Sequence, residues 1–164
     1  MTIKTQGTCL GVLLALGLVG VAVAGTATST LTLNVTVIDE PCVINGGNPI
    51  DIDFGNEMLT NKVDGSNYLK TVEYNLDCTN ASNPALKLKI SGTGADFDGT
   101  VLQASQTDLG IRLLSDGTPL ALNSWLNFAS DTPPLLQAVP VKSPGGKLTA
   151  GTFTAVATMT VDYQ

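Results

Sequence analysis

The chain has 164 residues and a net charge of −6, with 8 basic and 14 acidic side chains and no histidine. An acidic chain without a basic tail is a poor match for nucleic acid or anionic lipid. The lack of histidine excludes histidine-dependent catalytic triads and imidazole metal sites, so we expect no catalytic residues, metal or cofactor.

The first 24 residues have the features of a secretory signal peptide. Lys4 gives a weakly basic start, Leu10–Val23 is apolar and uncharged, and Ala22-Val23-Ala24 is a small-x-small cleavage site. The apolar stretch is short for a membrane span and has no basic stop signal after it. We therefore expect export, no membrane insertion of the mature chain, and a mature chain that begins at Gly25 and is long enough for one domain.

The mature chain keeps two cysteines, Cys42 and Cys78, because Cys9 leaves with the signal peptide. Two cysteines in an exported chain predict one disulfide. The alternative is a metal pair, but two thiols without histidine supply too few ligands for zinc.

Short alternating segments predict β-strands along the rest of the chain. They are separated by turn signals such as Asp64-Gly65, Asp116-Gly117 and Pro144-Gly145-Gly146, and no window has a helical period. Many short strands with turns between them indicate an all-β sandwich. The predicted strands are 31–37, 50–54, 68–78, 86–90, 109–114, 135–141 and 153–163.

Two groups of side chains suggest other chemistry, and each has a simpler interpretation. Asp51 and Asp53 resemble an acid–base dyad or a calcium site, but such pairs are routine on the solvent face of a strand. Trp125 with Phe128 resembles a sugar-stacking platform, but large aromatics more often fill the core.

Both ends of the mature chain carry a regular alternating strand. Near the start, Leu31, Leu33, Val35 and Val37 share one face, before Asp39-Glu40-Pro41 ends the segment. At the finish, one face carries Phe153, Ala155, Ala157, Met159, Val161 and Tyr163. In the ordinary interpretation these are a first strand and an edge strand of one complete sandwich.

Four features together resemble the subunits of bacterial chaperone–usher pili, of the minor or tip-fibrillum type. An alternating arm precedes Pro41-Cys42, and the second cysteine, Cys78, closes a strand. The last strand has a penultimate Tyr163, and Gly151 is the fourteenth residue from the end. Each feature alone is weak evidence, but the four features together make the resemblance specific.

The resemblance implies an incomplete immunoglobulin-like sandwich of six strands, with the seventh supplied in trans. Residues 25–41 would be the donor-strand extension, with Leu31, Leu33, Val35 and Val37 as donor side chains, and 42–164 the pilin domain. The acceptor groove and chaperone-binding strand would comprise Gly151, Phe153, Ala155, Ala157, Met159, Val161, Tyr163 and Gln164.

The same resemblance implies a function and a set of partners. The chain would pass through the periplasm with a pilus chaperone and be assembled at an outer-membrane usher. It would then polymerise with neighbouring subunits, including in some fibres a tip adhesin, into a surface fimbrium that supports cell adhesion. The arm departs from the family pattern at Val35, where a glycine is often found.

The alternative function is a self-complete secreted β-sandwich that recognises a glycan or host protein. Its candidate surface would be Trp125 with the loop at 92–99. A third possibility, an extracellular enzyme, rests only on the acidic pairs.

Overall fold

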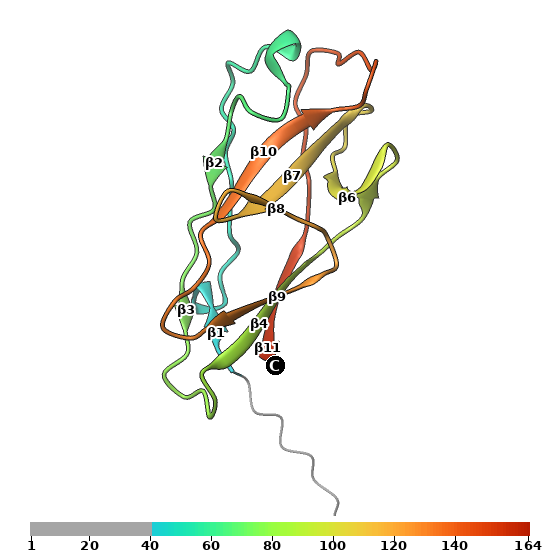
Figure 1. Cartoon of the computed structure of the whole chain (residues 1–164). Helices are drawn as coiled ribbons and strands as arrows, with labels where there is room; N and C mark the ends of the chain where they lie inside the picture. The colour runs from blue at the N-terminus through green and yellow to red at the C-terminus, as the bar shows by residue number, and fades with distance from the viewer. Residues whose placement is uncertain (1–40) are drawn as a thin grey trace, which may run out of the picture. The chain divides into compact units, whose positions relative to one another are not determined.

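The computed structural model describes residues 41–164, which form an all-β fold of short strands (Figure 1). The strands are β1 (Val43–Ile44), β2 (Lys70–Thr71), β3 (Leu76–Asp77), β4 (Ala85–Ser91), β5 (Gly94–Ala95), β6 (Asp98–Gln103), β7 (Leu109–Ser115), β8 (Thr118–Leu120), β9 (Trp125–Ala129), β10 (Leu136–Lys142) and β11 (Thr158–Tyr163). Two 3₁₀ turns, η1 (Asn45–Gly47) and η2 (Thr60–Lys62), complete the elements of this region.

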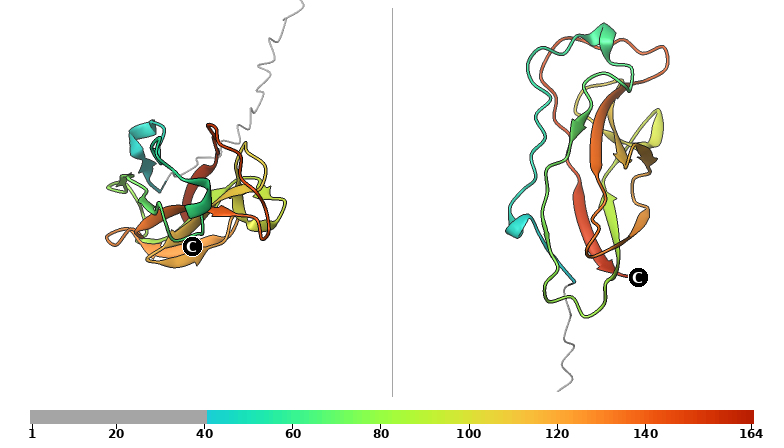
Figure 2. Two further views of the ribbon diagram at one scale, coloured as in Figure 1. Left: turned by 90° about the horizontal axis from the view of Figure 1, so that it is seen from above. Right: turned by 60° about the vertical axis from the view of Figure 1, so that its left-hand side comes forward.

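The strands form two principal sheets, seen from two further directions in Figure 2. One sheet has the order β2-β10-β7-β6-β5, with β8 paired to β7, and the other has the order β11-β4-β9. A short β1–β3 pair stands beside them. The position of β11 in the smaller sheet is the important one, because β4 is its neighbour on one edge and no strand of residues 41–164 pairs with its other edge.

The core lies between the sheets and follows the period-two pattern of the sequence. In β4, Leu86, Leu88 and Ile90 are buried while Lys87 and Lys89 alternate with them on the other face. Leu86 and Leu88 have no exposed surface. Ile111 and Leu113 belong to the same apolar cluster from the opposite sheet.

The disulfide Cys42–Cys78 links residues 36 apart and joins the chain just before β1 to the chain just after β3. Closing a loop of this size stabilises the fold by roughly 3–4 kcal/mol in the chain-entropy model. The disulfide lies next to the register pair Val43↔Asp77 of the β1–β3 ladder.

Several strands predicted from the sequence are confirmed with small changes of boundary. Residues 86–90, 109–114 and 135–141 correspond to β4, β7 and β10. The Asp116-Gly117 turn closes the β7–β8 hairpin, with φ of 50° and 78°, as a two-residue turn with both φ positive requires. The strands β1, β5, β6, β8 and β9 were not predicted. The predicted strand 31–37 and the signal peptide lie outside the described residues.

Three predicted strands are wrong in whole or in part. Residues 50–54 form no strand, residues 68–78 contain only β2 and β3, and the last strand begins at Thr158 instead of Phe153. The alternation is still present in these segments, because Ile52 and Phe54 are half-buried between exposed neighbours. Within residues 41–164, the segments 50–54 and 153–157 have no partner strand.

Trp125 does not fill the core, which corrects the interpretation from sequence. It lies on the outer face of β9 and is 42% exposed. The ammonium groups of Lys87 and Lys89 lie 5.0 and 4.4 Å from its ring centroid. Exposed cation–π contacts contribute about 0.5–1 kcal/mol each, so they account for an aromatic residue on this face.

We expect Leu88→Ala to lower the free energy of unfolding by about 2–5 kcal/mol, because it leaves a cavity in the core. Trp125→Ala should cost less than about 1 kcal/mol, since it removes only surface contacts. Urea denaturation of the purified chain, followed by circular dichroism, measures both. Equal losses would contradict the placement of the two side chains.

Candidate functional site

An open apolar groove of about 970 Å³ is the main candidate site. One wall comes from the segment between β1 and β2 and the other from the segment before β11 together with the start of that strand. Figure 1 draws most of both walls as coil, although each has the alternating sequence of a strand. The apolar lining is Ile50, Ile52, Phe54 and Met58 on one side, Phe153, Ala155, Ala157 and Met159 on the other, and Val72, Ile90, Leu102, Ile111 and Leu113 between them.

The wall at 150–157 has few backbone contacts. Thr154 donates its N–H to the Ser105 hydroxyl at 2.9 Å, and its carbonyl accepts the Ser105 N–H at 2.8 Å. The strand pairing of β11 with β4 begins only at Thr158↔Ser91. The segment therefore presents backbone donors and acceptors along the groove where a neighbouring strand would ordinarily pair.

The groove differs in width along its length. The rings of Phe54 and Phe153, from opposite walls, have centroids 6.0 Å apart and touch across it. Further along, Ala155 and Ala157 leave more room. Gly92 packs close beneath this part, because an added Cβ would lie 2.5 Å from Leu102 Cδ1 and 3.7 Å from the Cβ of Ala157.

The groove can bind a partner through apolar side-chain contacts and backbone hydrogen bonds. Among its described lining residues, Asp51 and Asp53 alone carry a charge, and both side chains are exposed. Asp53 accepts the Gly55 N–H at 2.7 Å, which is an ordinary turn contact. Within residues 41–164 no cluster of three or more potential ligands for a metal ion occurs.

The structure brings together most of the residues predicted for the acceptor strand. Gly151, Phe153, Ala155, Ala157 and Met159 line the groove. The rest of that set lies beyond its end. Val161 is buried in the core, and Tyr163 packs against the core with its hydroxyl accepting the Ser82 N–H at 3.0 Å. The predicted donor residues Leu31, Leu33, Val35 and Val37 lie outside the described residues.

Sequence analysis missed the opposite wall. Ile50, Ile52 and Phe54 were interpreted as one face of an ordinary strand, and Met58 was not singled out. Their alternation was a usable signal for a strand-like wall. Nothing in it indicated that no strand of the described part of the chain would lie beside this wall.

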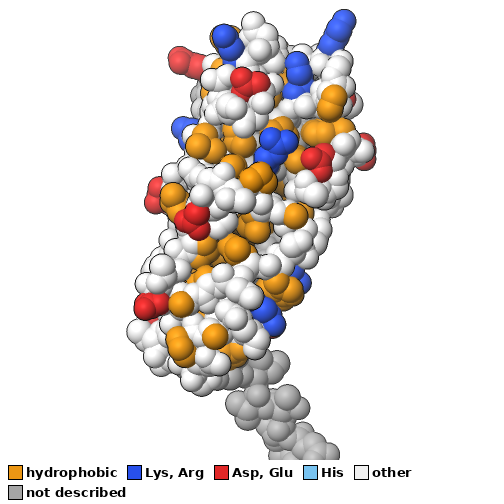
Figure 3. Space-filling view, viewed as in Figure 1, with side chains coloured by type: hydrophobic (Ala, Val, Ile, Leu, Met, Phe, Trp, Pro, Cys, Tyr) orange, Lys and Arg blue, Asp and Glu red, His pale blue; other side chains and the backbone are white. Residues whose placement is uncertain are grey.

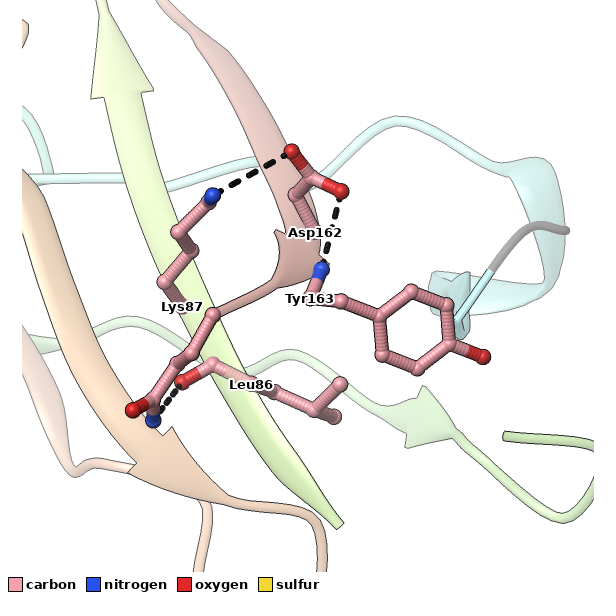
Figure 4. A network of polar contacts seen from close by, with 5 residues as sticks. Leu86, Lys87, Asp162 and Tyr163 are labelled. Carbon is pink, nitrogen blue, oxygen red and sulfur yellow. Dashed lines mark hydrogen bonds and ion pairs between the residues drawn. The ribbon is translucent and has the colours of Figure 1, made fainter. Parts of the chain in front are cut away.

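A polar network holds the end of β11. Asp162 pairs with the Lys87 ammonium at 3.5 Å and also accepts the N–H of Tyr163 at 2.8 Å (Figure 4). The side-chain amide of Gln164 donates to the carbonyls of Leu86 and Phe128 at 2.7 and 3.3 Å. The terminus is thus tied to β4 and β9, on the side away from the groove.

Other surfaces are less distinctive. On the face that carries β7, β8 and β10, apolar atoms are interspersed with polar ones through the middle, and most charged side chains lie toward the margins (Figure 3). No helix within residues 41–164 is long and apolar enough to cross a membrane.

Comparison with known proteins identifies relatives over most of the chain. Residues 21–164 match the family model described as "Fimbrial protein". The uncharacterized fimbrial-like protein YfcR of Escherichia coli (strain K12) is 41% identical over 149 residues, which cover 87% of this chain and 85% of YfcR. The putative minor fimbrial subunit PmfE of Proteus mirabilis (strain HI4320) is 29% identical over 153 residues, 81% of this chain but 42% of PmfE.

Solved structures agree with these relatives. The P pilus adaptor subunit PapF superposes with a TM-score of 0.56 and 30% identity, over 79% of this chain and all of PapF (100%). The P pilus rod subunit PapA gives a TM-score of 0.59 at 23% identity, over 84% of this chain and 100% of PapA, and at that identity shows the fold alone.

The groove should bind an apolar dye. We expect Ala155→Leu to reduce 8-anilinonaphthalene-1-sulfonate fluorescence by at least about half, because the larger side chain fills the groove. Val156→Leu is the matched control, since Val156 is 82% exposed and is not part of the lining. Equal fluorescence from the two variants would show that the dye reports another surface.

Proposed function

The chain belongs to the fimbrial protein family, and on that premise we propose that its groove receives a β-strand donated by another protein. The chain is a structural subunit of a bacterial surface pilus. Its work in this proposal is non-covalent assembly, without turnover and without a cofactor. The self-complete binding module is not favoured by its relatives.

The observation that carries the proposal is the pair of strand-like walls between which no strand of residues 41–164 lies. Neighbouring strands in a sheet lie about 4.7–4.9 Å apart, so one extended segment inserted in the groove can pair with the unpaired edge of residues 150–157. Its alternate side chains would enter the apolar space above Leu102 and Ile111. The strand addition would complete the sandwich and satisfy backbone groups that are otherwise left to water.

We assign the donor to residues 25–41, the arm that precedes the domain at 42–164. Leu31, Leu33, Val35 and Val37 share one face of this arm. Their burial in a neighbour's groove would contribute roughly 6–12 kcal/mol, at about 1.5–3 kcal/mol for each side chain. The conformational entropy that any segment loses on becoming ordered offsets part of this gain.

A chaperone is the expected first occupant of the groove. An exposed apolar groove with an unpaired edge invites aggregation, so a periplasmic chaperone that lends a strand would protect the chain after its signal peptide (residues 1–24) is removed. At the outer-membrane usher the arm of the next subunit would replace that strand. The assembled chain would then lie in a fimbrium at the cell surface.

Leu33→Asp tests the donor assignment. We expect the variant to be captured by its chaperone like the wild type, because its own groove is unchanged, but to fail as a donor since a charge would be buried. Asn34→Asp is the matched control, because Asn34 is on the other face of the arm. Fibre length by electron microscopy is the measurement, and wild-type fibres from Leu33→Asp would refute the assignment.

Ala155→Leu tests the acceptor site. A synthetic peptide of residues 27–38 should bind the wild-type chain, and we expect the substitution to weaken this binding at least about tenfold because the groove is partly filled. Fluorescence anisotropy of the labelled peptide measures the change, with Val156→Leu as control. Unchanged affinity in Ala155→Leu would exclude the groove as the binding site.

A further inference from the structure

We propose that the outer face of the smaller sheet binds an acidic sugar, which stacks on the Trp125 ring and pairs its anionic group with the Lys89 ammonium. The ligand class is a pyranose that carries a carboxylate or a sulfate. This site goes beyond the proposed assembly function and does not depend on it. A pilus subunit can carry such a site without being a self-complete binding module.

Strand register brings six side chains together on this face, in two rows that cross β11, β4 and β9. One row is Thr160, Lys89 and Trp125, and the next is Asp162, Lys87 and Asn127. Alternation keeps these side chains outside, because intervening residues such as Leu88 and Val161 are buried. We call the six residues the outer-face cluster. No member of the cluster lines the groove, so the two sites are separate.

The aromatic member of the outer-face cluster is accessible to a ligand. Trp125 is 42% exposed, although the ammonium groups of Lys87 and Lys89 lie 5.0 and 4.4 Å from its ring centroid. Phe128, which the sequence suggested as its partner in a sugar-stacking platform, packs against the core instead. The indole ring therefore offers an apolar surface for the C–H groups of one pyranose, with positive charge beside it.

The two lysines of the cluster differ in their electrostatic partners. Lys87 pairs with Asp162 at 3.5 Å (Figure 4). Within residues 41–164, Lys89 pairs with no carboxylate, and its ammonium contacts the indole ring. A carboxylate or sulfate beside the ring would supply the missing counter-charge through charge-assisted hydrogen bonds. The net negative charge of the chain opposes this only weakly, because salt screens exposed charges beyond about 8 Å.

The composition of the outer-face cluster favours a sugar over a protein partner. The core of a protein interface combines several apolar residues and contains few lysines. Here a single aromatic ring stands among polar side chains, and Thr160 and Asn127 are exposed and can form hydrogen bonds with sugar hydroxyls. Because this face is open and not a pocket, we expect weak, millimolar affinity for a single sugar.

Trp125 is the only tryptophan of the chain, so its intrinsic fluorescence reports this site directly. The probes are N-acetylneuraminic acid, glucuronic acid and galactose 6-sulfate, titrated into the mature chain. We expect at least one to change the emission saturably, and galactose to bind at least about tenfold more weakly because it lacks the anionic group. Acetate, an anion without a ring, should bind no better than galactose.

The acidic sugar that binds most tightly identifies the source of the ligand, as terminal sialic acids, uronic acid polysaccharides or sulfated glycans. No saturable change with any of the three would overturn the proposal. Binding of galactose or acetate as tight as that of the best acidic sugar would also overturn it.

Lys89→Gln tests the anionic contact. We expect it to weaken binding of the best acidic sugar about tenfold, to near the affinity of galactose, because the positive charge is lost. Lys70→Gln is the matched control, since it removes the same charge from an exposed position of β2 in the larger sheet. It should leave the affinity unchanged. Equal losses in the two variants would show an effect of net charge alone and would contradict the site.

Trp125→Leu tests the stacking contact, with binding measured by saturation-transfer NMR of the sugar protons and the fold checked by circular dichroism. We expect the transfer signal to be lost, because no ring remains for the sugar to stack on. An undiminished signal from a folded variant would refute the proposal. A tetra-aspartate peptide tests an acidic protein partner. If this peptide bound the wild type as tightly as the best acidic sugar, the cluster would be a peptide site and the sugar assignment would fall.

Discussion

The structure depends on one constraint: backbone N–H and C=O groups must be paired wherever a sheet meets an apolar surface. Among the described residues, the segment before β11 meets this requirement only at Thr154, through Ser105. The facing wall, residues 50–54, also has a strand-like sequence and pairs with no strand in that part of the chain. An extended segment from elsewhere would satisfy both the backbone edge and the apolar lining, which no small ligand of different shape would do.

The two edges of β11 differ. One edge is paired with β4, and the other faces the groove. The groove side presents an open backbone edge and apolar space among the described residues. The β4 side is tightly paired, and the polar contacts of Asp162, Tyr163 and Gln164 reinforce it. A strand held firmly along one edge can leave the other edge available without unravelling. This arrangement accounts for the regular alternation of the last residues. Along β11 the inward-facing side chains pack in the core beside β4, and before β11 Ala155 and Ala157 line the groove.

Sequence patterns predicted local structure well and pairing poorly. Period-two alternation located β4, β7 and β10, since those strands have partners within the chain. The same pattern overpredicted strands at 50–54 and 153–157, because alternation reports two faces and does not report whether a neighbour exists. The prediction for Trp125 was wrong for a related reason. Its size suggested burial in the core, but its ring lies at the surface and makes cation–π contacts with Lys87 and Lys89. Family resemblance and the alternation of the last strand singled out Gly151, Phe153, Ala155, Ala157 and Met159, which line the groove, but the opposite wall was missed.

Amide hydrogen exchange of the mature chain, with and without the peptide of residues 27–38, tests the central claim most directly. The account predicts that amides at 151–157 and 50–57 exchange rapidly in the chain alone and become protected when the peptide binds, while the amides of β4 and β7 change little. Strong protection of 151–157 in the isolated monomer, or no change when peptide is present, would show that the sandwich is already complete and would contradict the account.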